Sequence, residues 1–391
     1  MLVRVHVFKT SDDSKISEGW DISEIVHDLE YTTSIMGQPG KLSFIIEKDT
    51  GTSGFQIRMG YCVMFWHNDH EIFKGYIFSV GTDKSESCHV VAYDQMRYLQ
   101  SHSNELIDDN MTIRDVFYKI ISEAGIDRAN TRIIGKIDDS VKIKAKLFID
   151  TSYYDILQYA LNWTNSFSMT SEVEGNNNNV VDTYYYLRDN FGKLELRETR
   201  YCGTHDENGN ELNDWLIIGD RSLLTDYQYE SSIDKETYNE FLFMYNPKNK
   251  KSNDSKTNEQ VQSSTLIGAI QAGTLISKTN TKLDETSIGE NTIPKWGKLR
   301  KIVTVNDISD KDLLAEYMRM NVEHFNQPTR SLKLSALGYD GVYAGDTFHL
   351  LLGKLQMNTA VYVLNATHRY NGDMHTMELE VNTSPDMKIF S

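Results

Sequence analysis

The sequence predicts a mainly β protein of the α+β class, in which two similar β domains flank an α+β segment. Three stretches rich in aromatic and β-branched residues, separated by polar turns, lie between Met59 and Asp94 and predict a three-stranded meander. A similar succession returns between Ala344 and Val381, and in both places a glycine opens the first strand. The match is one of pattern rather than identity, and it indicates a duplicated β module, hence two similar sheets separated by other material.

The first domain is predicted over residues 1–104. Its opening residues, Met1–Phe8, alternate like a strand, and Ile22–Thr33 and Lys41–Glu47 predict a strand pair joined by a Gly- and Pro-containing turn. With the meander these strands are enough for a small barrel. The opening residues lack the basic start and apolar run of a signal peptide, and no apolar run reaches the ~20 residues that span a membrane.

The second domain is predicted over residues 105–222 because the hydrophobic pattern changes there to helical spacing. Met111–Ala124 has one apolar stripe, and Thr112 with Asp115 resembles a capping box. A second helix is predicted over Tyr153–Asn165 by the same criteria. Further predictions are strands at Tyr184–Arg188 and Lys193–Thr199, and a hairpin turn at Asn208-Gly209 before Trp215–Ile218.

The third domain is predicted over residues 223–391. It contains strands at Leu224–Ser231, Tyr238–Tyr245, Lys298–Val305 and Arg330–Leu337, a helix at about Ser309–Phe325, and the second meander. A polar excursion at 248–291 carries one apolar patch, Leu266–Ala272, which an unstructured linker would not need. The patch favours a short helix packed on the same chain or on a neighbour over a free loop. We therefore expect Leu266, Ile267 and Ile270 to lie at a subunit interface.

The search for catalytic and metal-binding patterns predicts no enzyme, no cofactor and no metal site. Nucleophile elbow, zinc-protease, phosphate-loop and dinucleotide motifs do not occur. Asp206–Glu211 begins like a calcium loop but lacks its glycine, so a hairpin turn is favoured. The run from His67 to His70 could hold a metal, yet a solvated turn between strands is favoured. Cys62, Cys88 and Cys202 share no CxxC spacing, which predicts neither a zinc site nor a disulfide framework.

The charge balance limits the classes of partner. The formal net charge is −16, whereas binding to nucleic-acid phosphates needs a basic footprint, so we expect no specific nucleic-acid binding. Glycan binding remains an alternative because the chain has 22 Tyr and 5 Trp.

Short motifs spread along the whole chain resemble those of XkdQ/YqbQ-type phage tail proteins, which are baseplate hubs of contractile phage tails and phage-tail-like bacteriocins (the late control D-like hub family). The matching segments are Trp20–Ser23, Asp28–Ser34, Pro39–Phe44, Ile293–Leu299, Asn326–Leu332 and Gly341–Asp346. The resemblance implies two tail-tube-like split β-barrel domains plus the intervening α+β domain. It also implies a homotrimer, whose six barrels match a six-fold tail tube and a three-fold spike.

The resemblance further implies a tail tube protein, a spike protein and baseplate wedge proteins as partners. The protein would be made in the bacterial cytoplasm and reside in the baseplate of the particle. We expect acidic side chains to line the lumen, and a neutral or basic lumen would contradict this. The alternatives are a receptor- or glycan-binding tail protein and a cell-wall hydrolase component.

Overall fold

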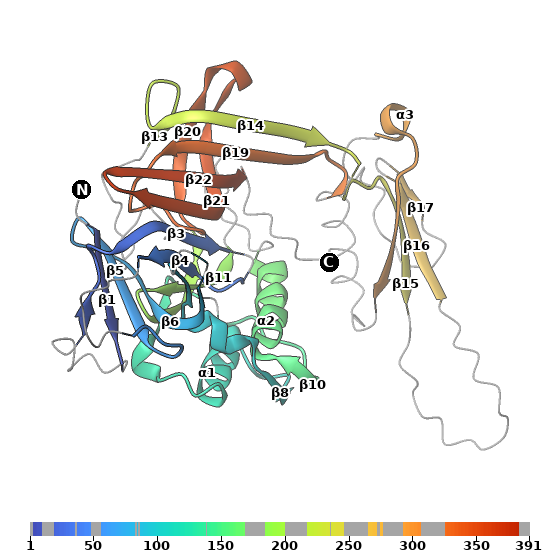
Figure 1. The fold of residues 1–391 in the computed structure, drawn as a ribbon. Coiled ribbons are helices and arrows are strands. Elements are labelled where there is room, and N and C mark those ends of the chain that lie inside the picture. The colour runs from blue at the N-terminus through green and yellow to red at the C-terminus, as the bar shows by residue number, and fades with distance from the viewer. Residues whose placement is uncertain are drawn as a thin grey trace. The chain divides into compact units, whose positions relative to one another are not determined.

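The computed structural model describes residues 3–9, 19–35, 37–47, 56–82, 84, 87–137, 139–168, 184–199, 217–234, 236–245, 265–271, 274–276, 292–305 and 325–382. These residues belong to two compact units, one within 1–228 and 332–391 and the other within 229–331. The elements of each unit are labelled in Figure 1. No helix within these ranges is long and apolar enough to cross a membrane.

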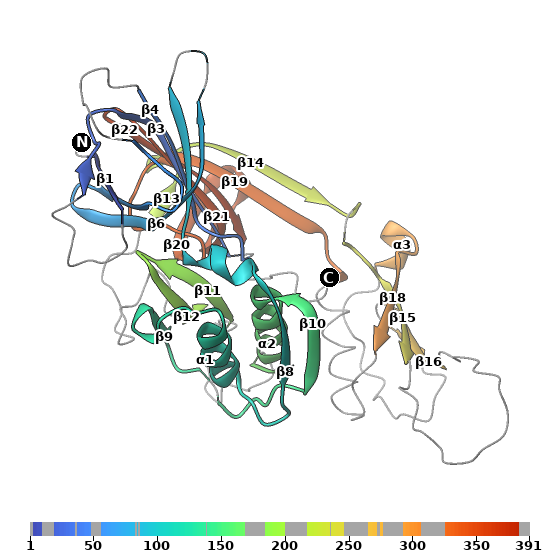
Figure 2. The same ribbon diagram turned by 60° about the horizontal axis from the view of Figure 1, so that its bottom comes forward.

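One curled sheet of 13 strands dominates the first unit, in the order β14-β19-β22-β21-β3-β4-β7-β6-β5-β1-β2, with β20 paired to β21 and β13 (Figures 1 and 2). Its N-terminal strands are β1 (Val3–Phe8), β2 (Trp20–Asp21), β3 (Val26–Ser34), β4 (Lys41–Ile46), β5 (Cys62–His67), β6 (His70–Thr82) and β7 (Cys88–Tyr93). The later strands are β13 (Ile217–Gly219), β14 (Leu224–Ser232), β19 (Thr329–Leu337), β20 (Thr347–Leu352), β21 (Met357–Asn371) and β22 (Met374–Asn382). The fold is therefore mainly β, as the sequence predicts.

The predicted recurrence is confirmed as a recurrence of strand order. The strands β3-β4-β7-β6-β5, which we call the first repeat, lie side by side in that order. The strands β14-β19-β22-β21-β20, which we call the second repeat, have the same order. Each meander, β5-β6-β7 and β20-β21-β22, is antiparallel throughout. The likeness therefore extends over five strands, two more than the sequence pattern revealed.

The two repeats also share hydrogen bonds at the glycine that opens each meander. The amide of Gly60 donates to the Ile77 carbonyl, and the amide of Gly345 donates to the Val363 carbonyl, each at 2.8 Å. Gly60 has a φ of 83° and Gly345 a φ of 92°, a left-handed conformation that favours glycine. The pattern of a glycine before a strand thus reports a backbone requirement at both places.

A β-bulge follows this hydrogen bond in each repeat. In the pairing of β6 with β7 the register shifts between Ile77 and Ser79. In the pairing of β21 with β22 it shifts between Val363 and Asn365. Bulges bend a strand and increase its twist, so an identical placement gives the two repeats the same local curvature.

The expectation of two separate sheets is wrong. The strand β21 pairs with β3 from Asn365↔Ser34 to Tyr370↔Leu29, and this contact joins the second repeat to the first. An unpaired strand edge exposes backbone donors and acceptors, and pairing the two edges satisfies them. The predicted domain boundaries at 1–104, 105–222 and 223–391 stay predictions.

Residues 95–199 of the same unit form a helix-containing part with its own hydrophobic core, built around α1 and α2. Its elements are the 3₁₀ turn Gln95–Gln100, β8 (His102–Ile107), α1 (Ile113–Glu123), the 3₁₀ turn Arg128–Asn130, β9 (Thr131–Ile134), β10 (Lys146–Ser152), α2 (Tyr153–Ser168), β11 (Tyr185–Asn190) and β12 (Lys193–Glu198). Strands β8 and β10 pair with each other, and β11-β12-β9 form a second small sheet.

Both predicted helix starts are confirmed by their caps. At α1 the side chains and backbones of Thr112 and Asp115 bond reciprocally as a capping box, and Gly125 follows the helix with a φ of 71°. At α2 the Ser152 hydroxyl accepts from the amide of Asp155 at 3.0 Å. These local hydrogen bonds explain why the helix starts were readable from sequence.

The second unit contains a four-stranded sheet in the order β17-β16-β15-β18. Its elements are β15 (Glu240–Tyr245), β16 (Thr265–Gln271), β17 (Thr274–Ile276), α3 (Ile293–Trp296) and β18 (Arg300–Val305). The expectation of a helix at Leu266–Ala272 is wrong, because β16 pairs with β15 on one side and β17 on the other. An apolar run this short fits either a helix or a strand, and strand pairing decides the outcome.

Three further predictions concern residues outside the described ranges. They are the helix at about Ser309–Phe325 (apart from Phe325 itself), the hairpin turn at Asn208-Gly209 and the rejected calcium loop at Asp206–Glu211. Cys202 also lies outside them. Of the other two cysteines, Cys62 is buried and Cys88 half-buried, and both are free thiols in strands.

Candidate functional site

The junction between the two repeats is held by side chains as well as by backbone pairing. Arg369 on β21 places its Nε 2.9 Å from a Glu30 carboxylate oxygen on β3 and its Nη1 2.7 Å from Glu378 on β22. The hydroxyls of Thr32 and Thr367 lie 3.3 Å apart across the same pair of strands. The ion pairs are part-exposed, so each contributes modestly to stability.

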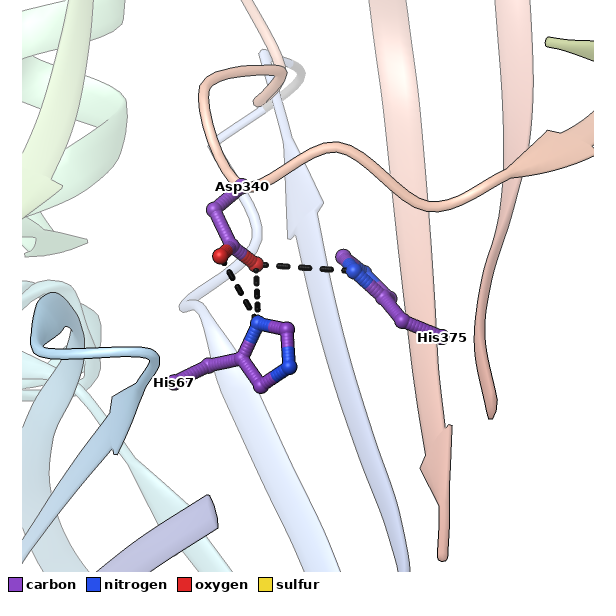
Figure 3. A group of neighbouring side chains, drawn as sticks. All are labelled: His67, Asp340 and His375. Carbon is purple, nitrogen blue, oxygen red and sulfur yellow. Dashed lines mark hydrogen bonds and ion pairs between the residues drawn. The ribbon is translucent and has the colours of Figure 1, made fainter. Parts of the chain in front are cut away.

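A buried polar cluster lies where the two repeats meet, and we call His67, Asp340 and His375 the seam cluster. His67 ends β5 of the first repeat, Asp340 lies in the loop between β19 and β20, and His375 lies on β22 (Figure 3). His67 Nδ1 lies 2.8 Å and 2.7 Å from the two Asp340 carboxylate oxygens. His375 Nδ1 lies 3.5 Å from Asp340 Oδ1. The three ligand atoms fall within 4.8 Å of one another.

The seam cluster is nearly closed to solvent. The side chains of His67 and His375 are each 2 % exposed, and that of Asp340 is 14 % exposed. The Tyr370 ring stacks on His375 with centroids 4.2 Å apart, and its hydroxyl donates to Asp340 at 3.4 Å. Burial raises the pKa of Tyr370 above its ordinary value. The carboxylate is therefore the part of the cluster most accessible to a solute.

His368 connects the seam cluster to the backbone. His368 Nδ1 lies 3.0 Å from His375 Nε2, and His368 Nε2 lies 2.6 Å from the carbonyl oxygen of Val342. Burial lowers the pKa of His368 to about 4 and that of His375 to about 3, so both imidazoles are neutral near pH 7. Neutral imidazole is the form of histidine that binds metal ions.

The structure corrects the prediction of a solvated turn for His67. The turn exists, since Asn68 and Asp69 adopt left-handed φ values of 47° and 68° between β5 and β6. His70 is exposed as expected. His67 instead points into the protein toward Asp340, because it is the last residue of a strand whose side chains are mostly buried.

The sequence did not identify Asp340, His368 and His375 as site residues. One signal for the two histidines was available: they flank a two-residue turn, and antiparallel pairing across it sets His375 opposite Tyr370 and close to His368. No local signal could have added Asp340 or His67, because they join the cluster only through long-range pairing.

A second buried polar group lies where the first repeat contacts the helix-containing part. The Asp94 carboxylate accepts from the amides of Gly40 at 2.7 Å and Met96 at 3.0 Å. The Asp189 carboxylate accepts from the amides of Gly192 at 2.8 Å and Gln95 at 3.2 Å. Burial raises the pKa of Asp94 well above its ordinary value and that of Asp189 to about 7. Both carboxylates therefore retain a proton more readily than an exposed aspartate does.

The three predicted interface residues, Leu266, Ile267 and Ile270, lie on β16 of the second unit. The register sets Leu266 opposite Met244 and Ile270 opposite Phe241, on β15. They belong to the second unit, whereas the seam cluster belongs to the first. Their role at a subunit interface stays a prediction.

Solved structures show how widespread this fold is. The 43 kDa tail protein of prophage MuSo2 from Shewanella oneidensis aligns over 98 % of this chain and 99 % of its own, with a TM-score of 0.63 and 10 % identity. A tail protein from Neisseria meningitidis MC58 aligns over 97 % and 96 %, with a TM-score of 0.59 and 12 % identity. A chain of the Francisella PdpA–VgrG complex aligns over 99 % of this chain and 59 % of its own, with a TM-score of 0.53 and 10 % identity.

At such identities these likenesses establish the fold. No curated protein matches the sequence. The family model described as YQBQ-like matches residues 29–291 and 274–382, which together span most of the chain and both repeats. The chain therefore belongs to the YqbQ-like family.

Proposed function

We propose that the protein is the structural hub of a contractile-injection baseplate. Three chains form a ring, and their six sheet repeats match a six-fold tail tube on one side and a three-fold spike on the other. The observation that carries this proposal is the junction of β3 with β21, which joins the second repeat to the first within one chain. A contact of the same kind between chains would close the ring.

The first repeat leaves open the strand edge that the second repeat uses at the junction. On β21, residues 365–370 pair with β22 on one edge and β3 on the other. Their counterpart on β6, counted from the shared bulge, begins at Ser79 and includes Thr82. Ser79–Thr82 pairs with β7 on one edge, and within the described residues no strand pairs with its other edge.

The second repeat leaves open the matching partner. The counterpart of β3 in the second repeat is β14, which is the outermost strand of the sheet. Most of its residues are exposed. If β14 of one chain pairs with β6 of the next, the contact between chains repeats the contact of β3 with β21. Three such contacts satisfy every open edge of this kind and leave none for further growth.

The expected register follows by counting along the strands. The amide of Leu337 on β19 donates to the carbonyl of Leu223 at 2.8 Å, which fixes β14 against β19. By analogy with Tyr31 opposite His368 at the internal junction, Thr82 then faces Gln228 of the next chain. This register makes the proposal testable at the level of single residues.

A cross-linking experiment tests the ring. The double variant Thr82→Cys, Gln228→Cys should give covalent dimers and trimers under mild oxidation. The control Thr82→Cys, Thr225→Cys places the second thiol out of register, and each single variant lacks a partner, so none of these should cross-link. Native mass spectrometry of the unmodified protein should show a trimer, alone or with the spike protein. A monomer under both conditions would remove the proposal.

The proposed partners are the tail tube, the spike and the baseplate wedges. The match to a chain of the PdpA–VgrG complex supports a role within a larger protein assembly. Pull-down from a lysate in which the whole particle is assembled should recover the tube and spike proteins with the trimer. The trimer cross-linked through the introduced cysteines is the better bait, because its ring stays closed. A partner that binds only an opened ring would then not be recovered.

We also propose that Leu266, Ile267 and Ile270 contact a neighbouring chain. Because β16 is an inner strand of its sheet, the backbone can stay paired when these positions are changed. Replacing the three residues by Ser should weaken the trimer while circular dichroism keeps its strand signal. Leu275→Ser on the edge strand β17 is the matched control. Unchanged assembly of the triple variant would exclude this interface.

A further inference from the structure

We propose that His67, Asp340 and His375 bind one divalent transition-metal ion of the zinc class, which ties the first repeat to the second. The proposal rests on the seam cluster alone and does not depend on the ring. Its three ligands come from β5, from the loop before β20 and from β22, so a bound ion would bridge segments far apart in sequence.

In the hydrogen-bond network of the seam cluster, the lone pair of His375 Nδ1 has no donor opposite it. The carbonyl of Val342 can only accept, so His368 Nε2 carries the proton and His368 Nδ1 accepts. His375 Nε2 must then donate to His368 Nδ1 at 3.0 Å. In neutral His375 the remaining nitrogen, Nδ1, is an acceptor, and it faces the Asp340 carboxylate, which is also an acceptor.

Two acceptors that face each other in a buried site repel unless something positive lies between them. A metal ion supplies that charge and accepts both lone pairs. His67 Nδ1 already lies against the same carboxylate, and it would bind the ion in the neutral tautomer whose proton sits on Nε2. The cluster thus offers two imidazole nitrogens that both face one carboxylate (Figure 3), with the ligand atoms within 4.8 Å of one another.

The donor set and its surroundings suit zinc. Two histidines and one carboxylate are a common zinc ligand set, with a water molecule in the fourth position. Bonds of about 2.0–2.1 Å in a tetrahedron place ligand atoms roughly 3.3 Å apart. The separations of 2.7 Å and 3.5 Å to Asp340 bracket that value, and all three ligand atoms lie within 4.8 Å of one another, so side-chain movement would have to bring them to that distance.

Three neighbouring residues hold the His375 ring in this orientation. His375 is bonded through its other nitrogen to His368, an arrangement typical of metal-binding histidines. A Cβ at Gly338 would lie 2.1 Å from Cγ of His375, so the glycine allows the loop to press against the ring. The Tyr370 ring stacks on the same imidazole. The imidazole therefore has little freedom to turn away.

Metal titration of the untagged full-length protein tests the proposal. After removal of metals with EDTA, added Zn²⁺ should bind at one equivalent per chain. Zn²⁺ at about 100-fold over its Kd should raise the Tm by about 5 °C, because the ion binds the folded chain. Added Co²⁺ should give the visible absorption of a site with nitrogen and oxygen ligands. No binding at one equivalent, or no change in Tm at saturation, would overturn the proposal.

Variants separate the seam cluster from adventitious binding by surface histidines. His375→Gln and Asp340→Asn should each weaken Zn²⁺ binding 10-fold or more and remove the Tm increase. His70→Ala and His102→Ala change exposed histidines and should leave both unchanged. Circular dichroism without metal checks that the variants fold. If His375→Gln does not fold, Asp340→Asn still tests the site, because asparagine keeps the shape of the aspartate side chain. Binding that survives both cluster variants and is lost in His70→Ala would overturn the proposal.

Discussion

The two repeats of the large sheet share strand order, bulge and opening glycine, yet their cores differ. The core of the first repeat contains several aromatic side chains, including Tyr31, Phe44, Phe65 and Phe73. The core of the second repeat is aliphatic apart from Phe348. One aromatic residue of the second repeat, Tyr370, packs in the core of the first, edge-on to Phe65 at 4.9 Å. The hydrophobic core of the first repeat therefore also packs the junction between the two repeats.

The comparison teaches how one strand arrangement can serve two kinds of contact. At the internal junction, β21 contributes His368 and Tyr370, both buried. Counted from the shared bulge, their counterparts in the first repeat are Thr82, which is exposed, and Lys84. The internal junction is thus built like a core, whereas the proposed contact between chains is polar. Such a chain can fold by itself before its open edges meet those of other chains.

Removing an aromatic ring from the first core should have the largest effect. Phe65→Ala and Phe348→Ala should each destabilise the protein by about 3–5 kcal/mol, because both rings are buried and leave cavities. Phe65→Ala should cost a further ~0.5–1.5 kcal/mol, since it also loses the ring contact with Tyr370. Urea unfolding of the two variants measures the difference. An equal or larger loss for Phe348→Ala would show that the first core does not hold the junction.

The opening glycines give a matched pair. A Cβ at Gly345 would lie 2.2 Å from the buried Tyr186 ring, whereas nothing lies within 4 Å of one at Gly60. Both substitutions pay ~1–2 kcal/mol for a left-handed φ, and only Gly345→Ala adds overpacking of ~1–3 kcal/mol. In thermal unfolding, Gly345→Ala should therefore have a lower Tm than Gly60→Ala. If the two variants unfold alike, the close approach at Gly345 relaxes without cost.

The pH response should come from the contact between the first repeat and the helix-containing part. In the second repeat Asp346 is paired with Arg188 at 3.0 Å, while the Asp94 and Asp189 carboxylates accept from backbone amides. The folded chain keeps a proton on Asp189 up to pH about 7, and the unfolded chain releases it near pH 4. Between these values the folded state binds more protons, so raising the pH lowers its stability, by at most ~1.4 kcal/mol per unit for one proton.

Urea unfolding at pH 4.5 and 7 should show that Asp189→Asn loses this contribution, so its stability falls less, or rises more, than that of the wild type over the interval. Glu71→Gln, at an exposed position on β6, is the control and should follow the wild type. Identical pH profiles for Asp189→Asn and wild type would show that Asp189 is ionised throughout.

The ion pairs of the junction should have the smallest effect. Arg369→Gln removes contacts to Glu30 and Glu378. The arginine side chain is 39 % exposed, and those of Glu30 and Glu378 are 36 % and 56 % exposed. Exposed pairs contribute ~0.2–1 kcal/mol, so the loss should stay below about 1 kcal/mol and shrink at high salt. A loss comparable to that of Phe65→Ala would mean that charge, not the aromatic core, joins the repeats.

Local signals in the sequence determined much of this protein. The strands follow from alternation and turn residues, and the helix starts follow from the Thr112 and Ser152 caps, which bond within three residues. The opening glycines and the recurrence of the meander were also visible, because each reflects a requirement of its own short segment. Family membership followed from motifs of the same kind.

Only the tertiary structure decided what those segments do to one another. The pairing of β3 with β21 joins positions more than 300 residues apart, and nothing in either strand names its partner. The same pairing, with β5 and the loop before β20, buries His67 beside Asp340 and His375, and strand pairing makes β16 a strand rather than a helix. Periodicity and caps act over a few residues, whereas strand edges are satisfied by whichever edge the whole fold brings to them.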